Sequence, residues 1–372
     1  MITGLRKAGL LLLLAATPRL VPAQTYSLLY SFSGVPDGSD PDSLIRTSAG
    51  DMYGTTGSGG VYNQGTVFKL DSSGNETVLY SFTGGSDGGG PVSVIRYGGK
   101  FYGTTYRGGD SDLGTIFVLD RKGKETVLHS FSGVPDGASP YTGLVRDPGG
   151  NLYGTTSRGG TSNRGMVFKL DPAGNFTILY SFTTGNDGLF PNSLIRDSSG
   201  NLYGTTDQGG GQFRQGTVFK LDSAGRETVL YSFSGGTDGG YPTGVIRSGG
   251  KFYGTTVSGG DIGLGTVFVL DKKNKETVLH SFSDIDGAFP GFGVIRDSAG
   301  NLYGTTEVGG TYEFGVVFKL DKTGKETVLY NFTGGNDGGS PASNLIRDSA
   351  GNLYGYVNGG TSGAGAIFEL TP

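Results

Sequence analysis

One tyrosine-centred motif returns seven times along the chain, and its spacing constrains the fold more than any other feature. The motif reads NLYGTT at residues 151–156 and varies only slightly elsewhere. Successive copies lie 49–51 residues apart, with their tyrosines at Tyr53, Tyr102, Tyr153, Tyr203, Tyr253, Tyr303 and Tyr354. Because a unit of this size buries its apolar face only against its neighbours, the chain is expected to fold as an array of similar units.

Each copy predicts four short antiparallel strands arranged as two hairpins. In residues 193–233 the runs SLIR and NLYGTT are joined by DSSG, and the runs TVFKLD and ETVLYSF are joined by SAGR. Asp-x-x-Gly turns of this kind connect hairpin strands, and no run has the 3.6-residue period of a helix. Four strands per repeat are typical of a propeller blade. A β-solenoid is the alternative, but its coils are shorter and do not fold back as hairpins.

The two ends of the chain supply complementary parts of one blade. Residues 25–32, TYSLLYSF, match the fourth strand of a repeat, whereas residues 343–370 contain three strands without a fourth. Pairing these segments closes a ring and leaves neither edge exposed. We therefore predict an all-β fold, a single seven-bladed β-propeller over residues 24–372. Each blade has four antiparallel strands, and the N-terminal strand completes the last blade.

Residues 1–23 have the features of a secretory signal peptide. Arg6 and Lys7 precede a short leucine-rich core, and Val21 and Ala23 occupy the −3 and −1 positions of a cleavage site. No second apolar stretch predicts a transmembrane segment, so the expected location is secreted or periplasmic. Removing residues 1–23 changes the formal net charge from −4 to −7, which argues against nucleic acid as a partner. We expect a monomer.

Metal and cofactor chemistry have little support in the sequence. The chain has no cysteine and two histidines, and His129 and His280 stand where other copies have tyrosine. Zinc sites and nucleophilic triads need cysteine or histidine in combinations that this chain does not offer. We therefore interpret both histidines as packing variants, and we expect no metal and no cofactor.

An Asp-Gly-x-x-Pro motif stands at every connection between repeats. A ring of seven carboxylates suggests a calcium site, but one site does not need seven copies. The alternative is that each aspartate accepts backbone hydrogen bonds within its own turn, and we favour this scaffolding role. The aspartates are Asp37, Asp87, Asp136, Asp187, Asp238, Asp286 and Asp337.

Seven arginines also recur, each at the end of the first strand of a repeat. A ring of arginines could bind an anion, but we favour pairing with recurrent carboxylates such as Asp71, Asp120 and Asp171. The arginines are Arg46, Arg96, Arg146, Arg196, Arg247, Arg296 and Arg347.

Taken together, the DG..P, LIRD..GNLYGTT, GG and GTVFKLD elements resemble the GloVer tandem-repeat proteins, which are secreted bacterial proteins with a β-propeller-type repeat. The resemblance covers nearly all of residues 25–370. It implies a propeller fold and export. It implies no reaction and no ligand. Members of this family often end in an anchoring segment, whereas this sequence ends at Pro372, just past its last predicted strand.

Residues that do not recur are the candidates for a binding site. They lie in the repeat-to-repeat crossings and in the loops after each YGTT, which share the face opposite the tight hairpin turns; we call this the top face. Aromatic and planar polar side chains on an exposed rim suit sugars or extended peptides, although the aromatics could merely cover neighbouring blades. The candidates are Phe190, Tyr241 and Phe289 in three consecutive crossings, and Tyr106, Arg107, Arg158, Asp207, Phe213 and Tyr312 in the loops.

The sequence leaves three functions open. The favoured one is a secreted or periplasmic binding module for a polysaccharide or an envelope protein. The second is a glycan-active hydrolase or lyase that uses top-face carboxylates such as Asp207 and Glu307 as acid and base, although nothing distinguishes these two from ordinary loop acids. The third is a purely structural surface protein.

Overall fold

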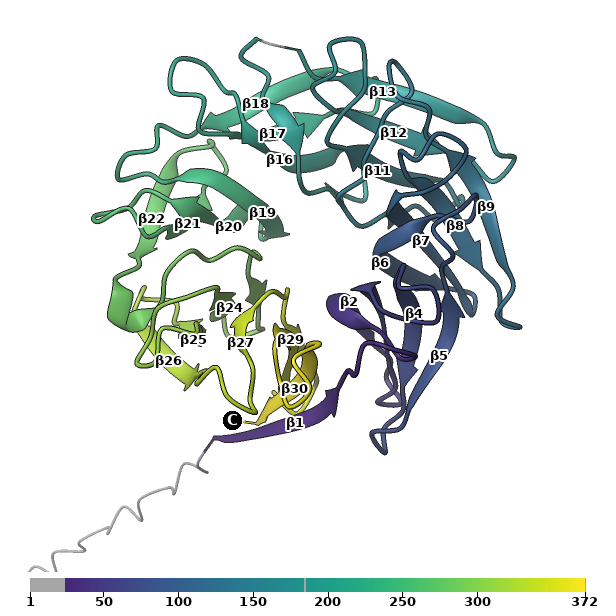
Figure 1. The fold of residues 1–372 in the computed structure, drawn as a ribbon. Coiled ribbons are helices and arrows are strands. Elements are labelled where there is room, and N and C mark those ends of the chain that lie inside the picture. The colour runs from purple at the N-terminus through teal and green to yellow at the C-terminus, as the bar shows by residue number, and fades with distance from the viewer. Residues whose placement is uncertain (1–23, 184, 372) are drawn as a thin grey trace, which may run out of the picture.

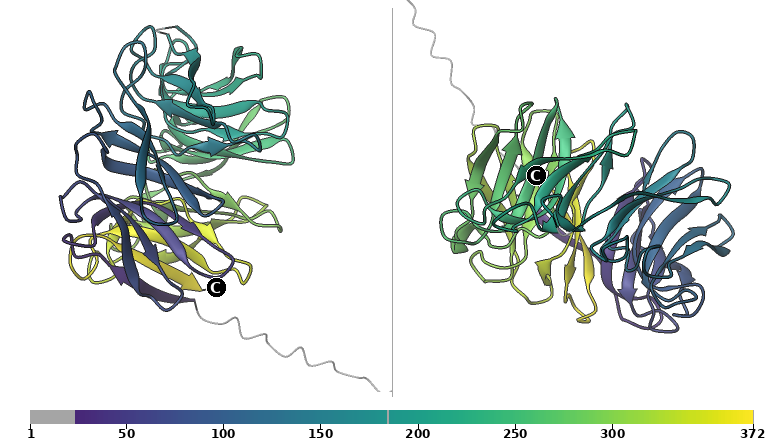
Figure 2. Two further views of the ribbon diagram at one scale, coloured as in Figure 1. Left: turned by 90° about the vertical axis from the view of Figure 1, so that its right-hand side faces the viewer. Right: turned by 90° about the horizontal axis from the view of Figure 1, so that it is seen from above.

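Seven small antiparallel sheets surround a common axis in the computed structural model of the chain (Figure 1). The structure describes residues 24–183 and 185–371, and the predicted signal peptide over residues 1–23 lies outside them. Figure 2 shows the same ring from two further directions. The predicted all-β, seven-bladed propeller is confirmed, and a 3₁₀ turn, η1 (Asp284–Asp286), is the helical segment of the described residues.

The blades follow one another in chain order. Blade 1 consists of β2 (Ser39–Arg46), β3 (Met52–Ser58), β4 (Thr66–Leu70) and β5 (Glu76–Ser81). Blade 2 consists of β6 (Gly89–Tyr97), β7 (Lys100–Arg107), β8 (Thr115–Leu119) and β9 (Glu125–Ser130). Blade 3 consists of β10 (Val145–Arg146), β11 (Leu152–Thr156), β12 (Met166–Leu170) and β13 (Phe176–Ser181). Blade 4 consists of β14 (Leu189–Pro191), β15 (Ile195–Arg196), β16 (Leu202–Gln208), β17 (Thr217–Leu221) and β18 (Glu227–Ser232).

The remaining blades are built in the same way. Blade 5 consists of β19 (Gly240–Ser248), β20 (Lys251–Ser258), β21 (Thr266–Leu270) and β22 (Glu276–Ser281). Blade 6 consists of β23 (Ile295–Arg296), β24 (Leu302–Thr306), β25 (Val316–Leu320) and β26 (Glu326–Asn331). Blade 7 consists of β27 (Gly339–Pro341), β28 (Ile346–Arg347), β29 (Leu353–Asn358), β30 (Ala366–Thr371) and β1 (Thr25–Ser31). The first strands lie beside the axis and the fourth strands form the outer edge (Figure 1).

The glycine of each YGTT motif makes room for the core of its own blade. In blade 1, Gly54 lies directly opposite Phe68, and a Cβ atom at Gly54 would stand 2.6 Å from the Phe68 ring. Phe68 is fully buried as a result. Two positions along, the buried hydroxyls of Thr56 and Thr66 lie 2.9 Å apart in a hydrogen bond between the same strands. Glycine in a strand often marks such a close approach.

The ring closes through the last blade. β1 pairs antiparallel with β30, from Thr25 opposite Thr371 to Ser31 opposite Ala366. Phe32, which follows β1, is fully buried and packs with Phe68 of blade 1 and other residues of blades 7 and 1. Each of the seven hydrophobic clusters spans one pair of neighbouring blades in the same way. A propeller has no other hydrophobic core, so each blade is stabilised by packing against the two blades beside it.

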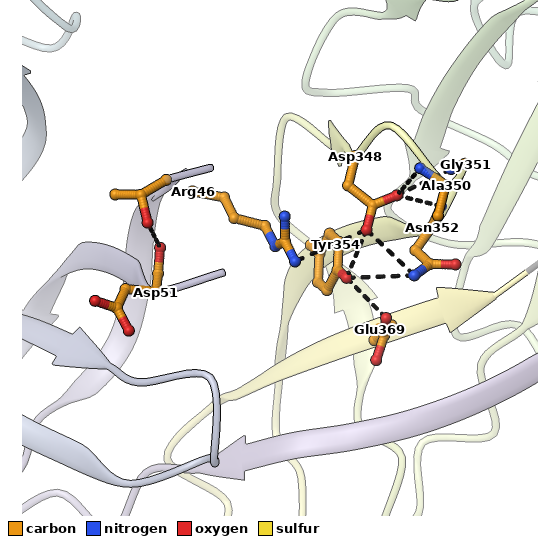
Figure 3. Close-up of polar contacts among 9 residues, drawn as sticks. Arg46, Asp51, Asp348, Ala350, Gly351, Asn352, Tyr354 and Glu369 are labelled. Carbon is orange, nitrogen blue, oxygen red and sulfur yellow. Dashed lines mark hydrogen bonds and ion pairs between the residues drawn. The ribbon is translucent and has the colours of Figure 1, made fainter. Parts of the chain in front are cut away.

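Each motif tyrosine supports the arginine of the following blade. At the closing joint, Arg46 of blade 1 extends over the ring of Tyr354 in blade 7 at 4.6 Å and lies 3.8 Å from the Asp348 carboxylate (Figure 3). The Tyr354 hydroxyl donates a 2.7 Å hydrogen bond to Glu369 (Figure 3). All seven arginines lie over the tyrosine of the preceding blade at 4.6–6.0 Å. These are cation–π contacts.

Asp71, Asp120 and Asp171, the carboxylates expected to pair with these arginines, are not their partners, but Arg46 and Arg247 do pair with recurrent aspartates of the preceding blade, Asp348 and Asp197. Asp71, one of the expected partners, accepts the backbone N–H groups of Ser73 and Asn75 within its own hairpin turn. Asp120 and Asp171 make the same kind of turn. All seven arginines also contact an aromatic ring across the joint, which a search for opposite charges does not identify.

The crossing aspartates hold the turns between blades, as the scaffolding interpretation predicted. Asp187 accepts a 2.9 Å hydrogen bond from the Tyr180 hydroxyl and a 2.8 Å bond from the Thr183 backbone N–H. In two crossings a histidine replaces the tyrosine: His129 Nε2 lies 3.0 Å from Asp136, and His280 Nε2 lies 3.1 Å from Asp286. The histidines are therefore packing variants.

A glutamate begins the outer strand of five blades, and one of its oxygens is buried without a hydrogen-bond partner among the described residues. These residues are Glu76, Glu125, Glu227, Glu276 and Glu326. Burial first, and then the charge of the neighbouring crossing aspartate, raises the pKa of each carboxyl to about 7. Blades 3 and 7 have aromatic residues at this position instead: Phe176 stacks on His129 at 4.0 Å, and Tyr26 stacks on Tyr330 at 4.3 Å.

Deleting residues 24–33 should strongly destabilise the protein, because the deletion removes β1 and the buried Phe32 and exposes the edge of β30. Losing a buried phenylalanine alone costs about 3–5 kcal/mol, so we expect the melting temperature to fall by about 10 °C or more. The control is a chain that starts at residue 24. Equal melting temperatures for the two chains would show that β1 does not close the ring.

Because of these five glutamates, we predict that the free energy of unfolding falls as the pH rises. A folded-state pKa of about 7 lies above the ordinary value of 4.5, so the folded protein retains protons that the unfolded chain releases between these two values. The contribution of these bound protons to the stability of the folded protein is fully present below pH 4.5 and is lost as the pH rises through about 7. Urea unfolding across this range should show the decline in the parent protein. A variant with all five glutamates changed to glutamine should show a flatter profile, and an unchanged profile would contradict the assignment.

Candidate functional site

Two positions in each blade vary from copy to copy and lie at the top ends of the inner strands. One directly follows the crossing proline, on or just before the innermost strand pairing, and the other follows the YGTT motif, at or just past the end of the second strand. We call these fourteen positions the axial patch. In blade order they are Asp42 and Gly57, Val92 and Tyr106, Tyr141 and Ser157, Asn192 and Asp207, Thr243 and Val257, Gly291 and Glu307, and Ala342 and Asn358.

An exposed pair of tyrosines joins two neighbouring blades in the axial patch. The rings of Tyr106 in blade 2 and Tyr141 in blade 3 meet edge to face, with their centroids 5.0 Å apart and their planes at 69°. Tyr106 is 42% exposed and Tyr141 is 59% exposed. Edge-to-face geometry is favourable for aromatic rings. The pair therefore presents an ordered aromatic surface to solvent.

The carboxylate of Asp42, in blade 1, lies near this pair. It occupies the space that a side chain at Gly57 would fill, since a Cβ atom there would stand 2.5 Å from Asp42 Oδ2. Asp42 reaches solvent, yet desolvation by the surrounding protein, followed by the charge of Asp40, raises its pKa to about 7. Burial, then Tyr106, then Asp42 raise the pKa of the Tyr141 hydroxyl. Blade 2 lies between blades 1 and 3, and Gly57 O of blade 1 and Tyr106 Cβ of blade 2 lie 3.6 and 3.8 Å from the point where a Cβ atom at Gly90 would stand. Asp42 therefore approaches the tyrosine pair from the neighbouring blade.

Sequence reasoning did not identify Asp42 as a site residue. A signal was nevertheless present: among the seven crossings, an aspartate follows the proline only in blade 1, and in that blade alone a glycine follows YGTT. In blade 1 the acidic side chain of Asp42 fills the space left by Gly57, and blade 6 has the opposite arrangement. There Glu307 lies against Gly291, so the acid stands on the second strand and the glycine on the first.

Asp207 and Glu307 show no sign of acting as an acid–base pair. Burial raises the pKa of both carboxyls, and neither pKa is raised by the charge of the other. The two carboxyls of a glycosidase lie about 5–10 Å apart, and like charges at such distances raise one of the two pKa values. Asp207 belongs to blade 4 and Glu307 to blade 6, with blade 5 between them.

The three crossing aromatics lie at consecutive joints of blades 4, 5 and 6. Phe190, Tyr241 and Phe289 are half-buried and have left-handed backbone conformations, with φ of 58°, 56° and 56°. Each donates its backbone N–H to a carbonyl of the preceding blade. Residues at the same position in the other crossings also have positive φ, so the conformation belongs to the joint: Asp40, Gly90, Ser139 and Ser340.

The other candidate residues are distributed more widely over the top face. Arg107 is exposed at the end of β7, and Arg158 and Phe213 are exposed in separate loops. Tyr312 is 53% exposed, and its hydroxyl is among the groups that raise the pKa of Tyr330 on the outer strand β26. Tyr312 therefore lies toward the outer rim, whereas Tyr106 and Asp207 belong to the axial patch. The nine predicted residues fall into an axial group, a joint group and a loop group.

A hollow of about 330 Å³ lies on the outer rim, away from the axial patch. It is lined by Asp238, Asp261, Glu276 and His280, among others. Asp238 and Glu276 are joint residues of blades 4 and 5, so the hollow is a widening of that joint. Within residues 24–183 and 185–371, no group of three or more histidine, cysteine or acidic side chains is arranged to hold a metal ion.

No helix among the described residues has both the length and the apolar character needed to cross a membrane.

Comparison with known proteins identifies the repeat. The sequence model of the Gloeobacter/Verrucomicrobia repeat matches residues 16–212 and 184–368 in two tandem copies. No curated protein matches the chain significantly.

Solved structures with a similar fold come from several bacterial proteins. The extracellular domain of a candidate hybrid two-component system from B. thetaiotaomicron has a TM-score of 0.61 at 10% identity, with 92% of this chain covered. This chain spans 39% of the length of that structure. PorZ, a surface component of the type-IX secretion system of Porphyromonas gingivalis, has a TM-score of 0.54 at 15% identity, covering 92% of this chain and 48% of PorZ. A candidate 6-phosphogluconolactonase from Bacteroides uniformis has a TM-score of 0.52 at 16% identity, covering 77% of this chain and 82% of that one.

Proposed function

The chain belongs to the Gloeobacter/Verrucomicrobia repeat family, and from this premise we propose that it is an exported binding module whose axial patch holds a polysaccharide. Export rests on the sequence of residues 1–23, which has the charge, apolar core and cleavage site of a signal peptide. Two propellers of similar fold are an extracellular domain and a bacterial surface component. Their locations are consistent with this proposal.

The observation that carries the binding proposal is the exposed pair Tyr106 and Tyr141. Large aromatic side chains at other repeated positions are buried in the joints, as Phe68 and Phe82 are. The rings of Tyr106 and Tyr141 instead lie on a surface that faces solvent. Aromatic faces with hydroxyl groups at their edges suit the apolar faces and hydroxyls of sugars.

The arrangement of variable and repeated residues supports the same proposal. The joints use the same aspartates, prolines, arginines and tyrosines in every blade, so they build the ring. The axial patch has a different pair of residues in every blade, as a site with one asymmetric ligand requires. Binding sites are commonly built in this way, on variable segments held by a rigid scaffold.

A glycan array probed with the full chain tests the proposal. The variant Tyr106→Ser/Tyr141→Ser should lose about 10- to 30-fold in affinity for the retained glycan, because each aromatic contact contributes about 1 kcal/mol. Both side chains are exposed, so the melting temperature should change little. The matched control is Tyr62→Ser, which removes a tyrosine that is 57% exposed in a loop of blade 1.

A second variant, Phe190→Ser/Tyr241→Ser/Phe289→Ser, separates the axial patch from the crossing aromatics. Loss of binding in this variant alone, with an unchanged melting temperature, would move the site to the joints of blades 4–6. If the parent protein binds no glycan on the array, the polysaccharide proposal is wrong. An envelope protein as ligand, or a structural role, would then remain.

A further inference from the structure

The axial patch has a charge of one sign. Three of its fourteen positions are acidic, Asp42, Asp207 and Glu307, and none carries lysine or arginine. Asp40 adds a fourth carboxylate beside Asp42 and contributes to raising its pKa. Burial raises the pKa of the three patch carboxyls, but a cation on a ligand would favour their ionised form. No position of the patch supplies a competing cation, so the patch favours a positive group on the ligand.

Asp42 has no ion-pair partner within the described part of the chain. Neither a salt bridge nor a side-chain hydrogen bond to its carboxylate occurs there, and its backbone carbonyl is what accepts the Tyr356 hydroxyl. The recurring aspartates elsewhere are all engaged: Asp187 accepts a tyrosine hydroxyl and Asp71 accepts backbone N–H groups. Within the described part of the chain, the Asp42 carboxylate therefore forms no hydrogen bond or ion pair that stabilises the fold.

Among the described residues, the two arginines that follow patch residues in the sequence form no ion pair with the patch acids. Arg107 follows Tyr106 at the end of β7, and Arg158 follows Ser157 just past the end of β11. The Arg107 guanidinium lies near Gly90, where a Cβ atom would stand 3.7 Å from its Nε. Gly57 O and Tyr106 Cβ lie 3.6 and 3.8 Å from the same point, so Arg107 lies at the edge of the axial patch. Neither arginine forms an ion pair with Asp42.

Three residues from three consecutive blades thus combine two kinds of recognition. The ring centres of Tyr106 and Tyr141 lie 5.0 Å apart. The Asp42 carboxylate lies 2.5 Å from the point where a Cβ atom at Gly57 would stand, and Gly57 O and Tyr106 Cβ lie 3.6 and 3.8 Å from the corresponding point at Gly90. Aromatic rings attract cations over their faces, and a carboxylate attracts them by charge. A neutral sugar would use the rings alone, and an acidic sugar would be repelled by Asp42 and Asp40.

We infer that the axial patch selects a cationic glycan, in which a sugar ring stacks on Tyr106 and Tyr141 and a protonated amine on the sugar pairs with Asp42. This inference rests on the proposed function and specifies its ligand class: an amino sugar with a free amine. The absence of a side chain at Gly57 allows the Asp42 carboxylate to take its position beside the axis.

The test compares two ligands that have the same sugar backbone and differ at the amine, which is free and protonatable in one and acetylated in the other. Isothermal titration of the full chain at pH 7 would use a glucosamine tetrasaccharide and its fully N-acetylated counterpart. The free amine should bind about tenfold more tightly, which corresponds to about 1.4 kcal/mol for one favourable charge pair in a partly desolvated site. The preference should weaken as salt is added, because exposed charge pairs are screened.

Two variants locate the charge effect. Asp42→Asn should reduce the preference to about onefold to twofold while leaving affinity for the N-acetylated sugar unchanged, since the side chain keeps its size. Asp110→Asn is the matched control: it removes an equal charge from an exposed top-face loop of blade 2 outside the axial patch, and the preference should remain. Melting temperatures confirm folding, and the two-ligand comparison on the parent protein needs no variant.

The outcomes separate this inference from the proposed function. If both sugars bind the parent equally well and Asp42→Asn changes neither affinity, the cationic assignment is wrong and glycan binding stands. If neither sugar binds, and the glycan array also retains nothing, both proposals fail. A preference for the amine that survives in Asp42→Asn would place the charge recognition on other acids and contradict the role given to Asp42.

Discussion

Every blade is fixed to the next by the Asp-Gly-x-x-Pro crossing, and the rest of the structure depends on this joint. The aspartate binds the tyrosine or histidine of the outer strand, as Asp187 binds Tyr180. The proline packs against a glycine of the preceding blade, where a Cβ atom at Gly65 would stand 2.6 Å from the Pro91 ring. A ring closes only if its successive joints turn the chain by matching angles, so similar residues must recur in all seven crossings.

This demand explains why one short motif recurs throughout the chain. The tyrosine of YGTT lies under the arginine of the next blade, the glycine admits a core phenylalanine, and the threonines bond to neighbouring strands. In blade 7 a tyrosine, Tyr356, replaces the first threonine and reaches the backbone of Asp42 in blade 1. The motif is therefore structural in every copy. Its residues are unavailable for a ligand, which leaves the axial patch and the loops to vary.

The fold could be predicted from the sequence because each repeat specifies its own hairpins and its own joint. The seven blades, the pairing of β1 in the last blade and the role of the crossing aspartates follow from local patterns repeated at a fixed spacing. The partner of each arginine could not be predicted, since Arg46 reaches Tyr354 only through the closed ring. The same is true of Asp42 and Tyr141, which are 99 positions apart in sequence and belong to blades that are not neighbours. Conversely, the predicted crossing aromatics are consecutive as expected, but their backbone conformation is set by the joint.

The central claim is that the same residues form all seven joints of the ring, and that the ring binds a glycan at its axial patch. A crystal structure of the protein with a glycan from the array tests that claim most directly. The account predicts ligand density over the rings of Tyr106 and Tyr141, beside the Asp42 carboxylate, with the joints unchanged. Ligand density on the outer rim near Tyr312, or over the lysine-bearing hairpin turns of the opposite face, would contradict it.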